Sequence, residues 1–238
     1  MEKLTYQEIM ADPQTAADYA HYRARIYRLA SSVFADDVTE ESLAQLIAVA
    51  CEATDDSCVR ACEAVLFSNL RAYEGADLPA LRTKIATEYA ELFVGPRPPL
   101  APCYESMYLG ANPRLFADVT MRVRAAYKEQ GFEVGKRNHV PDDHMGYELA
   151  FMGAMCDREA AAHESGDAAA VTACQVAQSN FLSVHLGVWA GFFASRVAAA
   201  WCAEYYNAWA QFVEAFVNDD MAFLRGCADN PVSAGEEA

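Results

Sequence analysis

Residues 88–108 read Glu-Tyr-Ala-Glu-Leu-Phe-Val-Gly-Pro-Arg-Pro-Pro-Leu-Ala-Pro-Cys-Tyr-Glu-Ser-Met-Tyr, and they interrupt a chain that is otherwise patterned for helices. A helical run ends at Gly95, and the prolines that follow are Pro96, Pro98, Pro99 and Pro102. Because proline fixes φ and has no amide hydrogen, this loop can become neither a helix nor a central strand. A stiff loop that ends in aromatic and polar side chains favours a preformed recognition surface, since little ordering entropy is lost on binding. The alternative is a long connector whose tyrosines pack on the core.

On both sides of the loop, apolar residues recur at steps of three and four, which indicates amphipathic helices nearly throughout the chain. Capping side chains and glycines set the expected helix ends. Thr39 is an expected N-cap without a capping-box partner, and Leu115 lies on the expected apolar face of its helix. The expected helices are residues 15–34, a helix after Thr39, a helix from Asp55 or Asp56 to Gly75, a helix from Asp77 to Gly95, a helix from Asn112 to Gly131, residues 143–164, a helix from Asp167 to Leu186, and two helices with an unplaced break between Trp189 and Phe216.

The pattern predicts an all-α fold, because helices that are apolar along one stripe must pack on each other. We expect a single-domain bundle of many helices over residues 1–228, with a long Pro-rich loop, and a disordered tail over residues 229–238. A division into two domains at the loop 94–112 or at the loop 131–140 is the less favoured alternative.

Composition restricts the class of partner. The chain has 34 acidic and 18 basic residues and a net charge of −16. This balance opposes binding to nucleic acid and to anionic lipid, both of which need clustered Lys and Arg. It is compatible with a basic partner, although acidic surfaces commonly serve only solubility.

The cysteines and the hydropathy pattern predict a cytoplasmic protein without stable membrane insertion. Eight cysteines occur without any Cys-x-x-Cys pair, so neither a disulfide framework nor a zinc motif is indicated. The N-terminal residues lack the basic start and apolar run of an export signal. The most apolar stretch, 184–203, is interrupted by His185, Ser195 and Arg196, which argues against a membrane span.

A second motif covers residues 139–152, His-Val-Pro-Asp-Asp-His-Met-Gly-Tyr-Glu-Leu-Ala-Phe-Met. Pro141 and Asp142 are typical of a helix start, where Asp142 would accept free amide hydrogens and Asp143 would complement the helix dipole. His144 and Glu148 lie four apart and therefore share a face of the expected helix.

Three interpretations of this motif compete. In the first, the two aspartates only cap the helix and His144 bonds Glu148 or a backbone group. In the second, a metal-binding helical-bundle enzyme uses His139, Asp143, His144 and Glu148, although His-Glu-x-x-His is absent. In the third, the acidic helix start and His144 form a polar recognition rim beside the Pro-rich loop.

Together the two motifs resemble the TorD/DmsD/NarJ family of redox-enzyme maturation chaperones, and the TorD/DmsD branch most closely. The first family pattern is Glu-Tyr-x-x-Leu-Phe-x-Gly-Pro, then prolines, then Tyr-x-Ser-x-Tyr; the second is Pro-Asp-His followed by Glu-Leu-x-Phe. The first is matched here by Glu88, Tyr89, Leu92, Phe93, Gly95, Pro96, Pro99, Pro102, Tyr104, Glu105, Ser106 and Tyr108. The second is matched by Asp143, His144, Glu148, Leu149 and Phe151, with Pro141 displaced by the additional Asp142, and a downstream pattern by Phe181, His185, Leu186 and Trp189.

This resemblance implies a cytoplasmic, non-enzymatic chaperone of all-α fold that needs no cofactor or metal of its own. Its partners would be the twin-arginine (Tat) signal peptide and the apo form of a molybdenum- or tungsten-cofactor oxidoreductase, such as a DMSO/TMAO-reductase-like subunit. It would assist cofactor insertion and delay export by the Tat translocon, as a monomer or a domain-swapped dimer. Gly95, Pro96, Pro99 and Pro102 would form the loop scaffold. The implied binding residues are Tyr104, Glu105, Ser106, Tyr108, Asp142, Asp143, His144 and Glu148.

Physical chemistry assigns the affinity for such a leader to its apolar segment. Exposed ion pairs with the two arginines would give only about 0–1 kcal/mol each. Burial of about four large apolar side chains would give roughly 6–12 kcal/mol before the ordering cost is subtracted.

Overall fold

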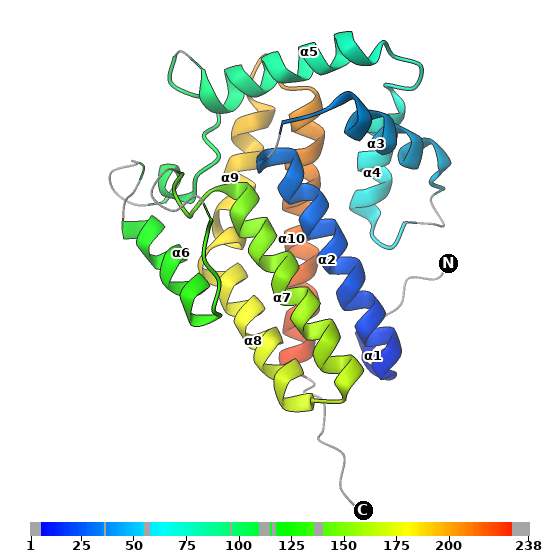
Figure 1. The fold of residues 1–238 in the computed structure, drawn as a ribbon, viewed down its shortest axis with the longest axis vertical. Coiled ribbons are helices and arrows are strands. Elements are labelled where there is room, and N and C mark those ends of the chain that lie inside the picture. The colour runs from blue at the N-terminus through cyan, green and yellow to red at the C-terminus, as the bar shows by residue number, and fades with distance from the viewer. Residues whose placement is uncertain are drawn as a thin grey trace, which may run out of the picture. The chain divides into compact units, whose positions relative to one another are not determined.

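The computed structural model describes residues 6–35, 37–54, 58–95, 97–109, 115, 118–135 and 140–229 of the 238-residue chain. Helices dominate this part of the chain (Figure 1), which contains no strand and one isolated bridge, between Tyr104 and His144. The predicted all-α single-domain bundle is therefore confirmed. The helices are α1 (Tyr6–Met10), α2 (Pro13–Ala35), α3 (Glu40–Glu52), α4 (Ala61–Arg71), α5 (Leu78–Tyr89), the π-helical turn η2 (Ala90–Val94), the 3-10 turn η3 (Glu105–Met107), α6 (Asp118–Glu129), α7 (Met145–Ser165), α8 (Ala168–Val184), α9 (Leu186–Ala198) and α10 (Tyr205–Asp229).

Within the bundle, the contacts group into two compact units. The first consists mainly of Ala35–Cys103 and Ala190–Phe216, and the second of Leu4–Phe34, Tyr104–Trp189 and Val217–Ala238. One boundary falls inside the Pro-rich loop, between Cys103 and Tyr104. The other boundaries fall within α2, α9 and α10, so each unit is built from separate parts of the sequence.

In the first unit, short polar contacts define the helix starts and ends. Thr39 Oγ1 accepts from the amide of Ser42, and Ser42 Oγ accepts from the amide of Thr39, which makes a complete capping box. The expectation that Thr39 lacks a capping-box partner is wrong, because a serine serves in place of the usual Glu or Gln. Asp77 caps α5 through the amide of Ala80, as predicted.

Gly95 ends the helical run in the same unit. Its φ of +45° lies in the region that favours glycine, and a Cβ there would meet the carbonyl oxygen of Arg97 at 2.8 Å. The loop then folds back on the π-helical turn, where the amide of Ala101 donates to the carbonyl of Leu92 at 2.8 Å. The glycine is therefore required for the turn that begins the Pro-rich loop.

Glu88, the first residue of the Pro-rich motif, caps a different helix. Its carboxylate accepts hydrogen bonds from the amides of Glu204, Tyr205 and Tyr206 at 2.9, 3.2 and 2.7 Å. Burial raises the pKa of Glu88, while these three amides act in the opposite direction. A side chain of α5 thus satisfies the first free amides of α10, which lies more than a hundred residues later in the sequence.

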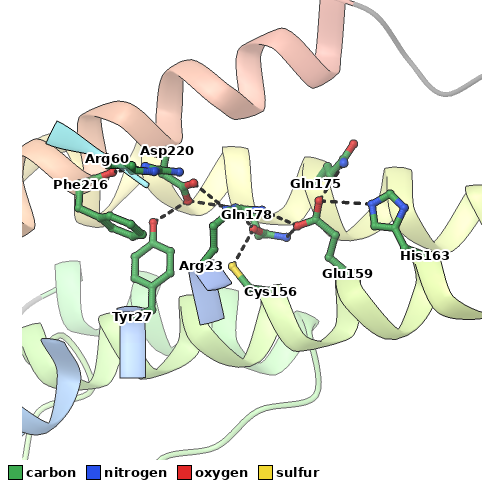
Figure 2. A network of polar contacts seen from close by, with 10 residues as sticks. All are labelled: Arg23, Tyr27, Arg60, Cys156, Glu159, His163, Gln175, Gln178, Phe216 and Asp220. Atoms are coloured by element: carbon green, nitrogen blue, oxygen red, sulfur yellow. Dashed lines mark hydrogen bonds and ion pairs between the residues drawn. The ribbon is translucent and has the colours of Figure 1, made fainter. Parts of the chain in front are cut away.

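In the second unit, α7 and α8 run side by side (Figure 1). Inside it, Arg23 of α2 is fully buried and donates to Glu159 of α7 at 2.6 Å and to Asp220 of α10 at 2.7 and 3.0 Å. Figure 2 shows Arg23 among these carboxylates, with Tyr27 bonded to Asp220 and Gln178 beside Glu159. We call Arg23, Tyr27, Glu159, Gln175, Gln178 and Asp220 the core network. It joins four helices through charge-assisted hydrogen bonds.

Some predicted helix positions are corrected here. Leu115 is 46% exposed and not part of the core. The structure describes the helix predicted to end at Gly131 from Asp118 onward. Its predicted start, Asn112, lies outside the described residues, as do Asp55 and Asp56. The unplaced break in the aromatic region falls between Ala198 and Tyr205. The tail predicted from Asp229 also lies outside the description, apart from Asp229 itself, which ends α10.

No single helix in the described part of the chain is both long and apolar enough to cross a membrane. Only α8 and α9 taken together reach that length and composition, and they are bent by 43° where they meet.

Candidate partner-binding site

The last five residues of the first sequence motif meet the second motif in space, within the second unit. Tyr104 and His144 form an antiparallel bridge, and the amide of Glu105 donates to the carbonyl of Asp143 at 3.0 Å. The amide of Ser106 donates to Asp143 Oδ2 at 2.8 Å. The segment Tyr104–Tyr108, which we call the motif segment, is therefore attached to the start of α7 through Asp143.

His144, not Asp142, is the N-cap of α7. Its Nδ1 accepts a hydrogen bond from the amide of Gly146 at 3.1 Å, and its ring packs edge-on against Tyr104 with a centroid distance of 5.1 Å. Burial lowers the pKa of His144 to about 4, because the charged imidazolium is poorly solvated there. The prediction that Asp142 caps this helix is wrong.

Asp142 instead forms an ion pair with Arg124 of α6, whose Nε and Nη2 lie 2.9 and 2.6 Å from Asp142 Oδ2. Tyr127 of the same helix donates to the carbonyl of Asp142 at 3.2 Å. The additional aspartate of this sequence thus fixes α6 against the start of α7.

Glu105 and Glu148 lie under the motif segment. His185 Nδ1 lies 3.1 and 3.2 Å from the two oxygens of Glu105, and Trp189 Nε1 donates to Glu148 Oε2 at 3.0 Å. Burial and then the neighbouring Glu105 raise the pKa of Glu148 well above its ordinary value, so the protonated form of Glu148 is favoured. Tyr108 packs on Trp189 with a centroid distance of 5.3 Å. We call Glu105, Asp143, Glu148, His185 and Trp189 the motif cluster.

The predicted binding residues therefore come together, but not as an exposed acidic rim. Glu105, Ser106, Asp143 and Glu148 have no exposed surface, and Asp142 is 2% exposed. Tyr104 and Tyr108 are partly exposed. Asp143 is covered because it binds the backbone of the motif segment, whereas Asp142 packs against Arg124 and Tyr127 of α6.

The residues predicted to form the loop scaffold differ in their exposure to solvent. Gly95 and Pro99 are partly exposed and Pro102 is buried, while Pro96 lies outside the described residues. All three described members belong to the first unit.

The described residues do not support the alternative of a metal centre. Within them, no three His, Cys, Asp or Glu side chains are arranged to hold an ion. Asp143, His144 and Glu148 have separate partners, namely Ser106, Gly146 and Trp189. His139 lies outside the described part of the chain.

Several residues of the site escaped sequence reasoning. His185 and Trp189 stood out only as members of the downstream pattern, and Arg124 gave no signal beyond being one basic residue on a helix. Outside the site, Glu88 of the first unit was marked by its motif, but its capping role depends on α10. Each partner lies too far away in sequence for a local pattern to reveal it.

The family model described as nitrate reductase delta subunit matches residues 40–195, which include both motifs. The chain belongs to this family. The resemblance to redox-enzyme maturation chaperones that the motifs predicted is thereby confirmed.

Similarity to individual members of the family extends over most of the chain. Chaperone protein TorD of Shewanella piezotolerans is 28% identical over 224 residues, which cover 89% of this chain and 96% of the relative. The TorD proteins of Shewanella sp. strain ANA-3 and Vibrio parahaemolyticus are 28% and 26% identical, and the matches cover 96% and 95% of their lengths.

Proposed function

We propose that this chain is a cytoplasmic maturation chaperone for a molybdenum- or tungsten-cofactor oxidoreductase. It binds the twin-arginine signal peptide and the apo-enzyme, assists cofactor insertion and delays Tat export. The observation that carries this proposal is the match to the family model together with nearly full-length similarity to proteins named TorD chaperones. This role requires binding and release but no catalytic step.

We assign different tasks to the predicted binding residues, and their burial supports this division. Glu105, Asp143 and Glu148 are buried, so in this conformation they hold the motif segment in place and do not contact a leader directly. Tyr104 and Tyr108 are partly exposed on that segment and can present their rings to a partner. Aromatic side chains held in one position bind with little loss of entropy.

Calorimetry with synthetic Tat leaders of molybdoenzymes from the same genome tests the proposal. We expect saturable binding to one leader, weaker binding after its Arg-Arg pair is changed to Lys-Lys, and weaker binding to a Tyr104→Ala, Tyr108→Ala variant. Tyr73→Ala is a matched control, because Tyr73 is also partly exposed but belongs to the first unit. Absence of binding to every leader would contradict the proposed function.

A further inference from the structure

Helix α8 differs in composition from the other helices that the structure describes. Its 17 residues, Ala168–Val184, include no Asp, Glu, Lys, Arg or His, whereas every other described helix has at least one. The chain as a whole has a net charge of −16. Absence of charge along a whole helix of so acidic a chain therefore requires an explanation.

Burial does not supply that explanation. One face of α8 is in the core and holds Gln178, Phe181 and Leu182, but the opposite face is open to solvent. Val176 and Val184 on that face are 53% and 55% exposed. The exposed residues are Ala169, Thr172, Ala173, Val176, Asn180, Ser183 and Val184. We call them the neutral face; depletion of charge combined with exposed apolar side chains is typical of the centre of an interface.

Two hollows flank the neutral face. One, of about 350 Å³, lies between α8 and the last turns of α10 and is lined by Val176 and Leu224 among others. The other, of about 280 Å³, lies between α6 and α8. Phe151 and Phe181 line it, together with the exposed Arg122 and Glu129 of α6. Asn180 lines both, so the hollows adjoin each other along α8.

The second hollow also reaches the motif cluster. His185 lines its end, and the same imidazole lies 3.1 Å from Glu105 of the motif segment. Small side chains on its two walls, Ala126 of α6 and Ala177 of α8, leave room for the side chains of an apolar segment. The second hollow thus connects the neutral face with the motif cluster.

We propose that the neutral face of α8 and its two hollows bind the uncharged apolar segment of the leader. This inference rests on the proposed function. A Tat leader has a charged start followed by an uncharged apolar stretch, and only the second part matches a helix face without charges. Docking there removes apolar surface from water without stripping solvent from any ionised side chain of α8.

A double variant, Val176→Glu with Val184→Glu, tests the inference by placing two carboxylates on the neutral face. We expect the Kd for the leader to rise about tenfold or more, because the charges must be desolvated on binding. Both valines are more than half exposed, so helicity and Tm should not change. Val49→Glu with Val65→Glu is the matched control, since these valines are 54% and 62% exposed on α3 and α4 of the first unit.

A charge-reversal experiment separates binding from folding. A leader with one Asp in its apolar segment should bind the native chain poorly, and Val184→Lys should recover part of that affinity. A folding defect could not produce such a recovery, so its absence would count against the neutral face.

The remaining outcomes are distinguishable. If the native chain binds no leader, the proposed function and this inference fail together. If it binds a leader and the double Glu variant binds equally well, only the inference is overturned. If the variant instead loses self-association of the native chain while leader affinity is unchanged, a second copy occupies the face and the leader does not.

Discussion

Two buried polar clusters in the second unit accommodate carboxylates in opposite ways. In the core network, Glu159 and Asp220 surround the guanidinium of Arg23, and all three are buried (Figure 2). In the motif cluster, Glu105, Asp143 and Glu148 are equally buried, but the donors described around them are backbone amides, the Trp189 indole and the His185 imidazole.

The pKa values follow this difference. Burial alone would raise the pKa of Glu159, but Arg23, His163, Gln178 and Gln175 lower it to about 2. No cation is found beside Glu148 among the described residues, and burial and then the neighbouring Glu105 raise its pKa well above the ordinary value. The comparison shows that burial does not decide the charge of a carboxyl group; the nearest donors do. The core network consists of buried ion pairs, whereas burial in the motif cluster favours the protonated form of Glu148.

The largest effect is expected for Arg23→Met, which removes the cation of the core network. Glu159 and Asp220 would then be buried without their counter-ion, and the free energy of unfolding at pH 7 should fall by about 3–5 kcal/mol. Urea denaturation measures this loss. The control Arg25→Met, at an exposed position of the same helix, should change the free energy of unfolding by less than about 0.5 kcal/mol. If Arg23→Met lowered the free energy of unfolding by less than about 1 kcal/mol, the ion pairs of the core network would not be what stabilises it.

Glu159→Gln should have the next largest effect, a loss of about 2–4 kcal/mol at pH 7, because it removes one of the two anions that hold Arg23. The folded-state pKa of about 2 lies below the ordinary 4.5, so the contribution of Glu159 is present above pH 4.5 and is lost as the pH falls toward 2. The variant should therefore destabilise strongly at pH 7 and little at pH 2.5. A constant difference between these two pH values would contradict the ionised state assigned to Glu159.

His144 should give a somewhat smaller effect that appears only on acidification. Its folded-state pKa of about 4 lies below the ordinary 6.5, so the unfolded chain takes up a proton first as the pH falls from 6.5 to 4. Stability should decrease by up to about 3 kcal/mol over this window. His144→Asn retains an N-cap acceptor but cannot titrate, and it should flatten the dependence measured by urea denaturation between pH 6.5 and 4.5. An unchanged slope would exclude His144 as its source.

The smallest effect is expected for Glu148→Gln, the counterpart of Glu159→Gln in the motif cluster. Glutamine replaces a protonated carboxyl group with little change in shape, so stability at pH 7 should change by less than about 1 kcal/mol. Because the pKa of Glu148 is raised, its contribution is present below pH 4.5 and is lost as the pH rises through the folded-state pKa. The variant should lack this decline. Equal losses for the two glutamine variants at pH 7 would remove the distinction between the clusters.

Local signals in the sequence predicted the helices with good accuracy. Asp77 and Asp167 cap the helices assigned to them, and Gly95 and Gly131 have the positive φ that ends a helical run. The main local error concerned the start of α7, where Asp142 was expected to be the N-cap but His144 takes that position. Asp142 is also a good N-cap residue, and its ion pair with Arg124 was decided by packing against α6.

The residues predicted for the candidate site lie close together in the structure, but the sequence did not predict which of them are exposed. The sequence placed Tyr104, Glu105 and His144 in one site through their family resemblance, and the structure brings them together. It could not show that the acids are covered, because the contacts that cover them join residues 37, 41 and 80 positions apart.

The sequence by itself determined the all-α class, most helix ends, the Pro-rich loop and the family, because proline, glycine and a repeat of 3.6 residues act within a few positions of the chain. Only the tertiary structure decided which carboxyl groups are ionised, which helix Glu88 caps and which face of α8 remains open. These properties depend on solvent access and on donors supplied by distant segments, and both exist only after the helices have packed.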